Sequence, residues 1–252
     1  MWSIRVAVLA AALIIWQVVV ETGLVDELLA SRPTAVVSYL GEVVRLPAFW
    51  HDFQSTSTAA LVSLVVGSIA GIVVGLVLHE VPVLSRAVSP YIALLNGLPR
   101  PALAPLFLVW FGLGLTAKVA VAVTIVFFVL LVNVASGLRA VDADQLHLAR
   151  SLGMTRRQRL LFVELQSATP SIIAGLRLAA VYAVLGVVVS EMVAATDGLG
   201  LRLVLETNSF NIAGTFGILL VLALLATLLD AGVSVLEQWI ARRRYGASGV
   251  DR

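Results

Sequence analysis

The stretch "AALVSLVVGSIAGIVVGLVL" (Ala59–Leu78) contains twenty residues and no charge. About twenty apolar residues are what an α-helix needs to cross the hydrocarbon core of a bilayer. A second uncharged stretch of the same kind covers Val119–Leu138. The chain as a whole is 60% hydrophobic and only 13% charged, whereas soluble domains are about one quarter charged. These features predict an all-α polytopic membrane protein.

Six membrane spans are expected in a single transmembrane domain that takes up residues 1–252. The first span could be a signal peptide, because Arg5 precedes its apolar run. The run is longer than most such segments and no Ala-x-Ala site follows it, so we interpret it as a span. The expected spans are residues 4–20, 59–78, 90–111, 119–138, 171–191 and 213–239.

The distribution of cations predicts the orientation of these spans. Eleven Lys and Arg residues fall on one side and four on the other, with two more inside spans. Cytoplasmic loops carry the excess of cations, so both termini are expected in the cytoplasm. The cation-rich side holds Arg5, Arg86, Arg139, Arg150, Arg156, Arg157, Arg159, Arg242, Arg243, Arg244 and Arg252; the other side holds Arg32, Arg45, Lys118 and Arg202.

Small residues recur at every fourth position of two spans. The second span has Ser63, Gly67, Gly71 and Gly75, and the fifth has Gly175, Ala179 and Ala183. Residues four apart share one face of a helix, and a face of small residues lets two helices approach closely in lipid. The pattern fits packing inside one subunit or packing across a dimer interface.

The third span is interrupted by four prolines in "SPYIALLNGLPRPALAPLF" (Ser89–Phe107). Proline removes a backbone donor and disrupts the preceding helical turn. Such a backbone is tolerated at membrane depth only when it is buried in protein or lines a wet cavity. We therefore expect Asn96, Pro99 and Pro101 near a transport path; the alternative is a surface loop between two short amphipathic pieces.

Residues 139–170, which we call the elbow, form the longest loop on the cation-rich side. Its segment "HLARSLGMTRRQRLLFVELQSATP" (His147–Pro170) carries four arginines. Leu148 and Leu152 share one helical face, and Gly153 is suited to end that helix in a left-handed conformation. Thr155 and Gln158 match a capping box, and Thr169-Pro170 can start the next span. The expected order is helix, glycine turn, basic helix and membrane entry.

The elbow resembles the EAA loop of binding-protein-dependent ABC importer permeases, whose pattern is E-A-A-x3-G-x9-I-x-L-P. Aligned on Gly153, Ala149 takes the last alanine, Leu148 the middle one and His147 the glutamate. Val163 takes the isoleucine, Leu165 the leucine and Gln166 the proline, so the glutamate and the proline are missing. The segments 105–114 ("PLFLVWFGLG") and 175–200 ("GLRLA…GVVVSEM…GLG"), with Asn133 before Gly137, resemble the nitrate/sulfonate/taurine branch.

This resemblance implies a type I importer permease fold in the cell inner membrane, with the elbow as a cytoplasmic coupling helix. It implies separate ABC ATPase subunits that bind ATP and Mg, an extracytoplasmic solute-binding protein and a second permease, identical or homologous. Asn133 and Glu191 join the expected path for a small anion or heterocyclic solute. The expected ATPase-docking residues are His147, Leu148, Ala149, Arg150, Leu152, Gly153 and Thr155.

The chain itself is expected to have no catalytic role. It contains no G-x-x-x-x-G-K-[ST] phosphate loop, no cysteine, and histidines (His51, His79, His147) without metal-ligand spacing, so no metal site is expected. No nucleic-acid partner is expected either. Arg177 is expected to extend toward the cytoplasmic face, and Asp230 to meet a partner on another span. The alternatives are a passive channel or a membrane enzyme; the latter needs clustered carboxylates or histidines, and the carboxylates within the spans are isolated along the sequence.

Overall fold

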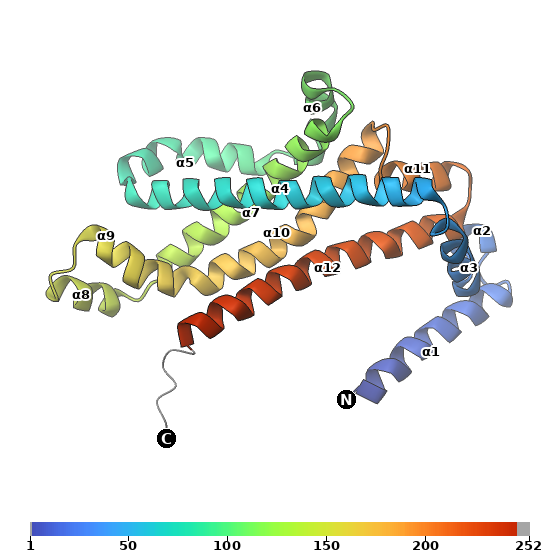
Figure 1. The fold of residues 1–252 in the computed structure, drawn as a ribbon, viewed down its shortest axis with the longest axis horizontal. Helices are drawn as coiled ribbons and strands as arrows, with labels where there is room; N and C mark the ends of the chain where they lie inside the picture. Colours follow the sequence, from blue (N-terminus) through green and yellow to red (C-terminus); the bar gives the residue numbers. More distant parts are fainter. Residues whose placement is uncertain (1, 246–252) are drawn as a thin grey trace.

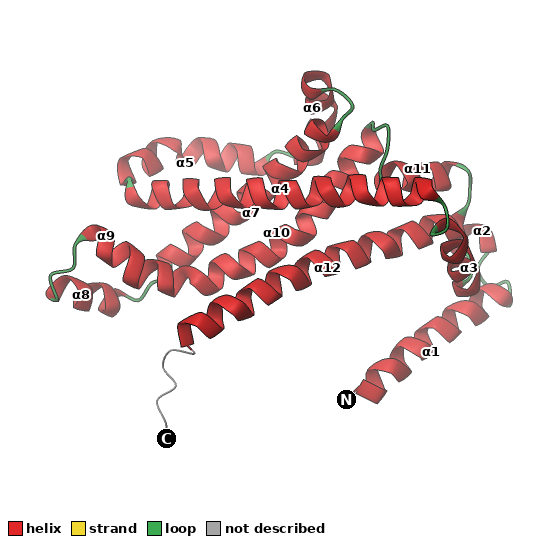
Figure 2. Cartoon of the chain, in the orientation of Figure 1, coloured by secondary structure: helices red, strands yellow, loops and turns green. Residues whose placement is uncertain are grey.

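The structure is a computed structural model that describes residues 2–245, with side chains described for residues 4–27 and 29–239. Every regular element in this part of the chain is a helix (Figure 2). The expected tail cations Arg242, Arg243, Arg244 and Arg252 lie outside the described side chains. The elements are α1 (Trp2–Glu21), α2 (Glu27–Ala30), α3 (Pro33–Val43), α4 (Pro47–Glu80), α5 (Pro82–Gly97), η1 (Arg100–Leu103), α6 (Ala104–Phe111), α7 (Leu115–Arg139), α8 (Ala143–Ser151), α9 (Arg156–Arg159), η2 (Leu160–Glu164), α10 (Leu165–Val193), α11 (Leu199–Asn208) and α12 (Ile212–Tyr245).

Five helices of the described chain are long and apolar enough to cross a membrane, and a bent pair brings the number to six. The helices are longer than the expected spans. α4 runs from Pro47 to Glu80 around the expected 59–78, and α12 extends past both ends of 213–239. α3, α4 and α5 each begin with a proline, which is well accepted in the first turn because its missing N–H needs no partner there.

The core is built on α4, α7 and α10, which cross one another closely (Figure 1). The glycines of α4 face α7: a Cβ added at Gly71 would lie 2.6 Å from the carbonyl oxygen of Phe127, and one at Gly67 would lie 2.7 Å from Val126. On α10, Ala179 and Ala183 are fully buried against Val126 and its neighbours. The two rows of small residues therefore pack inside the subunit. Of the two alternatives, packing within one subunit and packing across a dimer interface, the structure shows the first.

The third span is broken as expected. α5 and the η1–α6 segment meet at a bend of 86°. The helix starts earlier than expected, at Pro82, and Pro90 lies inside α5 rather than at its start. The break itself falls at residues 98–99, between Gly97 and Arg100.

The expected helix start at Thr169-Pro170 is wrong. Helical backbone continues from Arg156 through a π turn at Leu160–Glu164 into α10, and Pro170 lies within α10. The Thr169 hydroxyl donates to the carbonyl of Leu165 at 2.7 Å. The second helix of the elbow is thus continuous with the fifth span.

The molecule is elongated (Figure 1). α8 and α9 form one end, and α2, α3 and α11 lie at the other. The start of α1 and the end of α12 both point away from the α2–α3–α11 end (Figure 1). α1 lies apart from the α4–α7–α10 core and approaches the rest of the chain at its far end, where Trp16 meets Phe216 with ring centroids 5.4 Å apart.

Candidate functional site: the elbow and the buried ion pairs

The first helix of the elbow ends in a Schellman motif. The N–H of Met154 donates to the carbonyl of Ala149 at 3.0 Å, and the N–H of Gly153 donates to that of Arg150 at 2.9 Å. Gly153 has a φ of +70°, the left-handed conformation that glycine adopts without a steric penalty. The expected left-handed glycine is therefore confirmed.

The second helix of the elbow begins with the expected capping box. Gln158 N–H donates to the Thr155 hydroxyl at 3.3 Å, and Thr155 N–H donates to the Gln158 side chain at 2.9 Å. Both ends of the short turn at residues 152–155 are thus held by local hydrogen bonds. The angle between α8 and α9 is consequently defined by the elbow's own sequence.

The apolar side chains on α8 and at its C-terminal end differ in exposure. Leu148 and Leu152 are 62% and 69% exposed, which is unusual for leucine on a polar helix. Ala149 is 3% exposed and faces a hollow of about 570 Å³ between α8 and the start of α10. Leu148, Leu152 and the EAA-like positions Val163 and Gln166 line the same hollow. Of the expected docking residues, the two leucines, His147, Arg150, Gly153 and Thr155 are accessible, whereas Ala149 is internal.

Ion pairs tie the elbow to the end of α4. Arg156 Nε lies 2.8 Å from a carboxylate oxygen of Glu80. The buried Glu164 accepts from Arg159 at 2.9 Å and lies 2.5 Å from His79. The sequence did not predict these contacts, because their partners are 76 and 85 residues apart.

His79, Glu80 and Glu164 place one possible metal-ligand atom each within 4.8 Å of one another, so His79 is less isolated in space than in sequence. Both carboxylates are already paired with arginines. We therefore interpret the group as an ion-pair network that fixes the elbow on α4.

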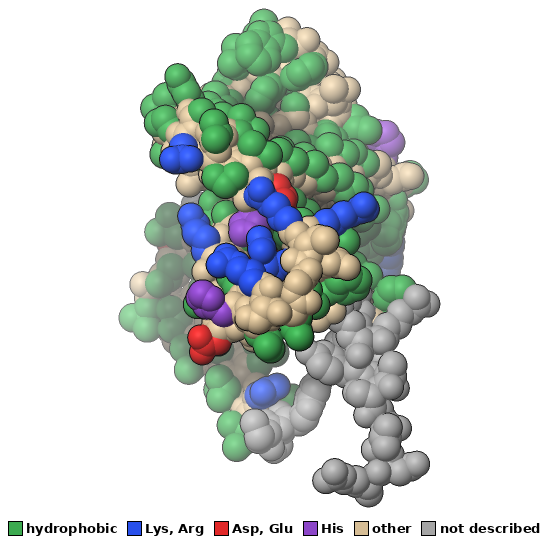
Figure 3. All heavy atoms as spheres, turned by 90° about the vertical axis from the view of Figure 1, so that its left-hand side faces the viewer, with side chains coloured by type: hydrophobic (Ala, Val, Ile, Leu, Met, Phe, Trp, Pro, Cys, Tyr) green, Lys and Arg blue, Asp and Glu red, His purple; other side chains and the backbone are tan. Residues whose placement is uncertain are grey.

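The end of the molecule that carries the elbow is basic (Figure 3). Several Arg side chains gather on this face, with few acidic side chains beside them. Arg86, Arg139, Arg150 and Arg157 are all exposed there. This charge favours the surface of an anionic membrane leaflet or an acidic partner.

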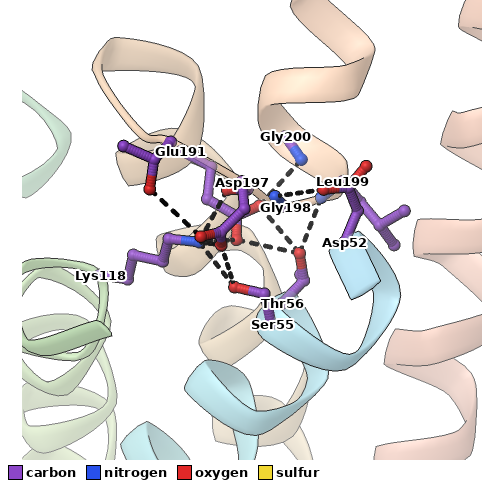
Figure 4. Close-up of polar contacts among 10 residues, drawn as sticks. Asp52, Ser55, Thr56, Lys118, Glu191, Asp197, Gly198, Leu199 and Gly200 are labelled. Carbon is purple, nitrogen blue, oxygen red and sulfur yellow. Dashed lines mark hydrogen bonds and ion pairs between the residues drawn. The ribbon is translucent and has the colours of Figure 1, made fainter. Parts of the chain in front are cut away.

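Polar side chains gather in the protein interior at the opposite end (Figure 4). Lys118 is 2% exposed, and its Nζ donates to Glu191 at 3.0 Å and to Asp197 at 2.7 Å. Thr56 and the N–H of Gly200 also donate to Glu191, at 2.9 and 2.8 Å. The cluster joins α4, α7, α10 and the start of α11.

Three expectations are refined here. Lys118 is a buried ion-pair partner, not a cation of an exposed loop, and Glu191 is fully buried among protein groups. The carboxylates are also not isolated in space, since Asp197 shares Lys118 with Glu191. A hint was present in the sequence: Lys118 and Glu191 are single charges near the same end of two neighbouring spans.

The loop after α10 is held by the same cluster. Asp197 is partly buried, which alone raises its pKa, but hydrogen bonds from Lys118 and Ser55 lower the pKa of Asp197 to about 2. Asp52 accepts from Gly198 N–H at 3.0 Å and from Arg202 at 2.6 Å. A Cβ at Gly198 would lie 2.1 Å from Glu191, so the carboxylate depends on a glycine at this position.

A further ion pair crosses between α10 and α12. Arg177 donates to both carboxylate oxygens of Asp230, at 2.9 and 3.1 Å. The expected partner of Asp230 on another span is therefore Arg177, and Arg177 is bound to Asp230 instead of extending freely to the membrane surface.

The remaining expected path residues lie on different helices. Asn96 ends α5, accepts from Arg100, and lines a cavity of about 290 Å³ between α4, α5 and α7. Pro99 and Pro101 flank Arg100 at the break and are exposed. Asn133 lies on α7, where its amide donates to Val129 and its side chain packs against Gly175. Asn96 and the two prolines thus lie at the break of the third span, Asn133 lies against α10, and Glu191 belongs to the Lys118 cluster.

Comparison with known proteins adds a family to this geometry. Residues 63–244 match the family model described as "Binding-protein-dependent transport system inner membrane component". The chain is 32% identical to the formylaminopyrimidine transport permease protein ThiX of Halalkalibacterium halodurans, over 75% of this chain and 76% of the relative. It is 27% identical to the taurine transport system permease protein TauC of Escherichia coli, over 94% of this chain and 88% of the relative.

Among solved structures, the fold is similar to a chain of the MetNI methionine ABC transporter in an inward-facing conformation. The TM-score is 0.67 at 20% sequence identity, over 77% of this chain and 96% of that chain.

Proposed function

The chain belongs to the family of binding-protein-dependent transport system inner membrane components, and on that premise we propose that the elbow docks on a cytoplasmic ABC ATPase and transmits its motion to α4 and α10. The chain is a multi-pass permease subunit of an ABC importer, a class that matches the nitrate/sulfonate/taurine branch. The passive-channel alternative is not favoured.

One observation carries the docking proposal: the elbow is a rigid turn that presents two exposed leucines beside exposed arginines. Leu148 lies on α8 and Leu152 follows directly after its end, one turn further on; both are largely exposed and both line the hollow beside α8. Exposed apolar side chains on an otherwise polar, well-capped helix are typical of a surface that a partner covers. The contacts Arg156–Glu80 and Glu164–His79 join the elbow to α4, and the unbroken helix joins it to α10, so the elbow is connected mechanically to two spans.

The complete importer that we propose has further parts. Two permeases, identical or homologous, enclose the path; separate ATPase subunits bind ATP and Mg; and an extracytoplasmic binding protein delivers the solute. Both termini face the cytoplasm together with the elbow. A small anion or a heterocycle is the proposed solute, since taurine and formylaminopyrimidine appear in the names of two relatives.

The test places a negative charge on the proposed docking surface. Leu148→Glu and Leu152→Glu should insert at normal levels, because both side chains are exposed and no membrane contact is lost. Each should reduce the amount of ABC ATPase that copurifies with the tagged chain at least tenfold, because a carboxylate must be desolvated at the interface. Arg157→Gln, an exposed change on α9, is the matched control and should keep the ATPase. Normal ATPase recovery with both glutamate variants would reject the docking surface.

A further inference from the structure

Beyond the first span, three of the described cations lie in apolar sequence, at least thirteen residues along the chain from any other charged residue: Arg100, Lys118 and Arg177. The structure gives two of them carboxylate partners. Lys118 is paired with Glu191 and Asp197, and Arg177 with Asp230. Arg100 has no carboxylate partner among the described residues. A cation at membrane depth without a counter-charge is costly, and its presence there is a functional indication.

The guanidinium of Arg100 is held by neutral groups, which leave its positive charge uncompensated. Its Nη2 donates to the carbonyl oxygen of Asn96 at 3.0 Å and also to the Asn96 side chain. The guanidinium carbon lies 4.6 Å from the centre of the Phe128 ring, within cation–π distance. Its Nε is buried and has no hydrogen-bond partner among the described residues. The group is thus oriented by an amide and a ring, and donors remain unused.

The position of Arg100 is the break of the third span. It begins η1, between the end of α5 and the start of α6, where the chain bends by 86°. Pro101 and Ala102 beside it are exposed. A broken backbone at membrane depth must be covered by protein or face water. The exposed side of η1 therefore adjoins a wet space or a neighbouring subunit.

From these contacts we infer that Arg100 is the residue of the translocation path that contacts the solute, and that it selects a small oxyanion such as a sulfonate, a nitrate or a carboxylate. Guanidinium donors match the two oxygens of such a group, and arginine stays charged at any physiological pH. Asn96 and Phe128 act as positioning residues. The inference rests on the proposed importer function and narrows its solute to an anion.

The test measures the charge near Arg100 with thiol reagents, because the chain has no cysteine of its own. Ala102→Cys places one thiol two residues from Arg100. In membranes, this thiolate attacks the sulfenyl sulfur of a methanethiosulfonate reagent, forms a mixed disulfide and releases methanesulfinate. Two reagents are compared, one carrying an ethylsulfonate and one an ethyltrimethylammonium group. The ratio of their rates reports the local electrostatic potential and, with the first reagent, access of a sulfonate.

We expect the thiol of Ala102→Cys to react faster with the sulfonate reagent than with the ammonium reagent. When Arg100→Gln is added, the ratio of the sulfonate rate to the ammonium rate should fall on the order of tenfold, because one unit charge a few ångströms away is removed. Arg100→Lys should keep most of the ratio. Arg86→Gln, an exposed arginine at the other end of α5, is the control and should leave the ratio unchanged.

Two results would overturn the inference. An unchanged ratio with Arg100→Gln would show that its charge is not felt at the break. A thiol inert to both reagents in every nucleotide condition would show that Arg100 faces no aqueous path. Both results are read from thiol reaction rates, whereas a failure of the proposed function is read from ATPase copurification, so the two failures are distinguishable.

Discussion

Gly153 shows at the scale of one residue how the elbow is shaped. Its φ of +70° allows the Met154 and Gly153 N–H groups to reach back to α8 and close the helix. A Cβ at this position would meet no atom within 4 Å, so space is not the constraint. The constraint is the backbone conformation, which costs an L-residue about 1 kcal/mol and a β-branched one more.

Gly153→Val should therefore redirect α9 relative to α8 without affecting the packed spans. We expect normal membrane levels, with solute uptake and ATPase recovery reduced severalfold or more. Gly153→Asn is the matched control, because asparagine adopts the left-handed region more readily than other non-glycine residues. Equal uptake and ATPase binding in the valine and asparagine variants would contradict the importance of the turn angle.

Short-range sequence patterns predicted most of the local structure of the elbow. Caps and turns can be predicted in this way because their hydrogen bonds join residues close in sequence. The Schellman glycine and the capping box involve residues at most five apart, so sequence spacing is sufficient to find them. Pro170 misled the prediction of a helix start, because proline inside a helix cannot be told from proline at its start by local sequence. Long-range partners were out of reach: Arg177 and Asp230 are 53 residues apart, and Lys118 and Glu191 are 73 apart.

At the scale of an element, the contact between α4 and α7 depends on the absence of side chains at the glycines of α4. Gly71→Leu should force the two helices apart, since even its Cβ would overlap the Phe127 carbonyl. Overpacking of a tight interface costs about 1–3 kcal/mol, so thermal unfolding in detergent should shift to a clearly lower temperature. Gly232→Leu is the control, because a Cβ there meets no atom within 4 Å. If both variants unfolded at the same temperature, close helix contact at Gly71 would not be stabilising.

Over the whole molecule, the two ends have different chemistry and are joined by the same helices. The elbow end is basic, with exposed leucines, whereas the opposite end holds the buried cluster around Lys118. α4 and α10 connect them: α4 carries Thr56 near one end and Glu80 at the other, and α10 continues from the elbow to Glu191. Movement of the elbow would thus reach the far end through rigid elements rather than through loops.

The central claim is that this chain provides a path and a coupling surface, while ATP is hydrolysed on separate subunits. The most direct measurement is ATP hydrolysis by the tagged chain purified in two forms, alone and together with the ABC ATPase that it retains. We predict no hydrolysis by the chain alone, because its sequence contains no phosphate-binding loop, and hydrolysis in the form that carries the ATPase. Sustained nucleotide turnover by the chain free of other subunits would contradict the account.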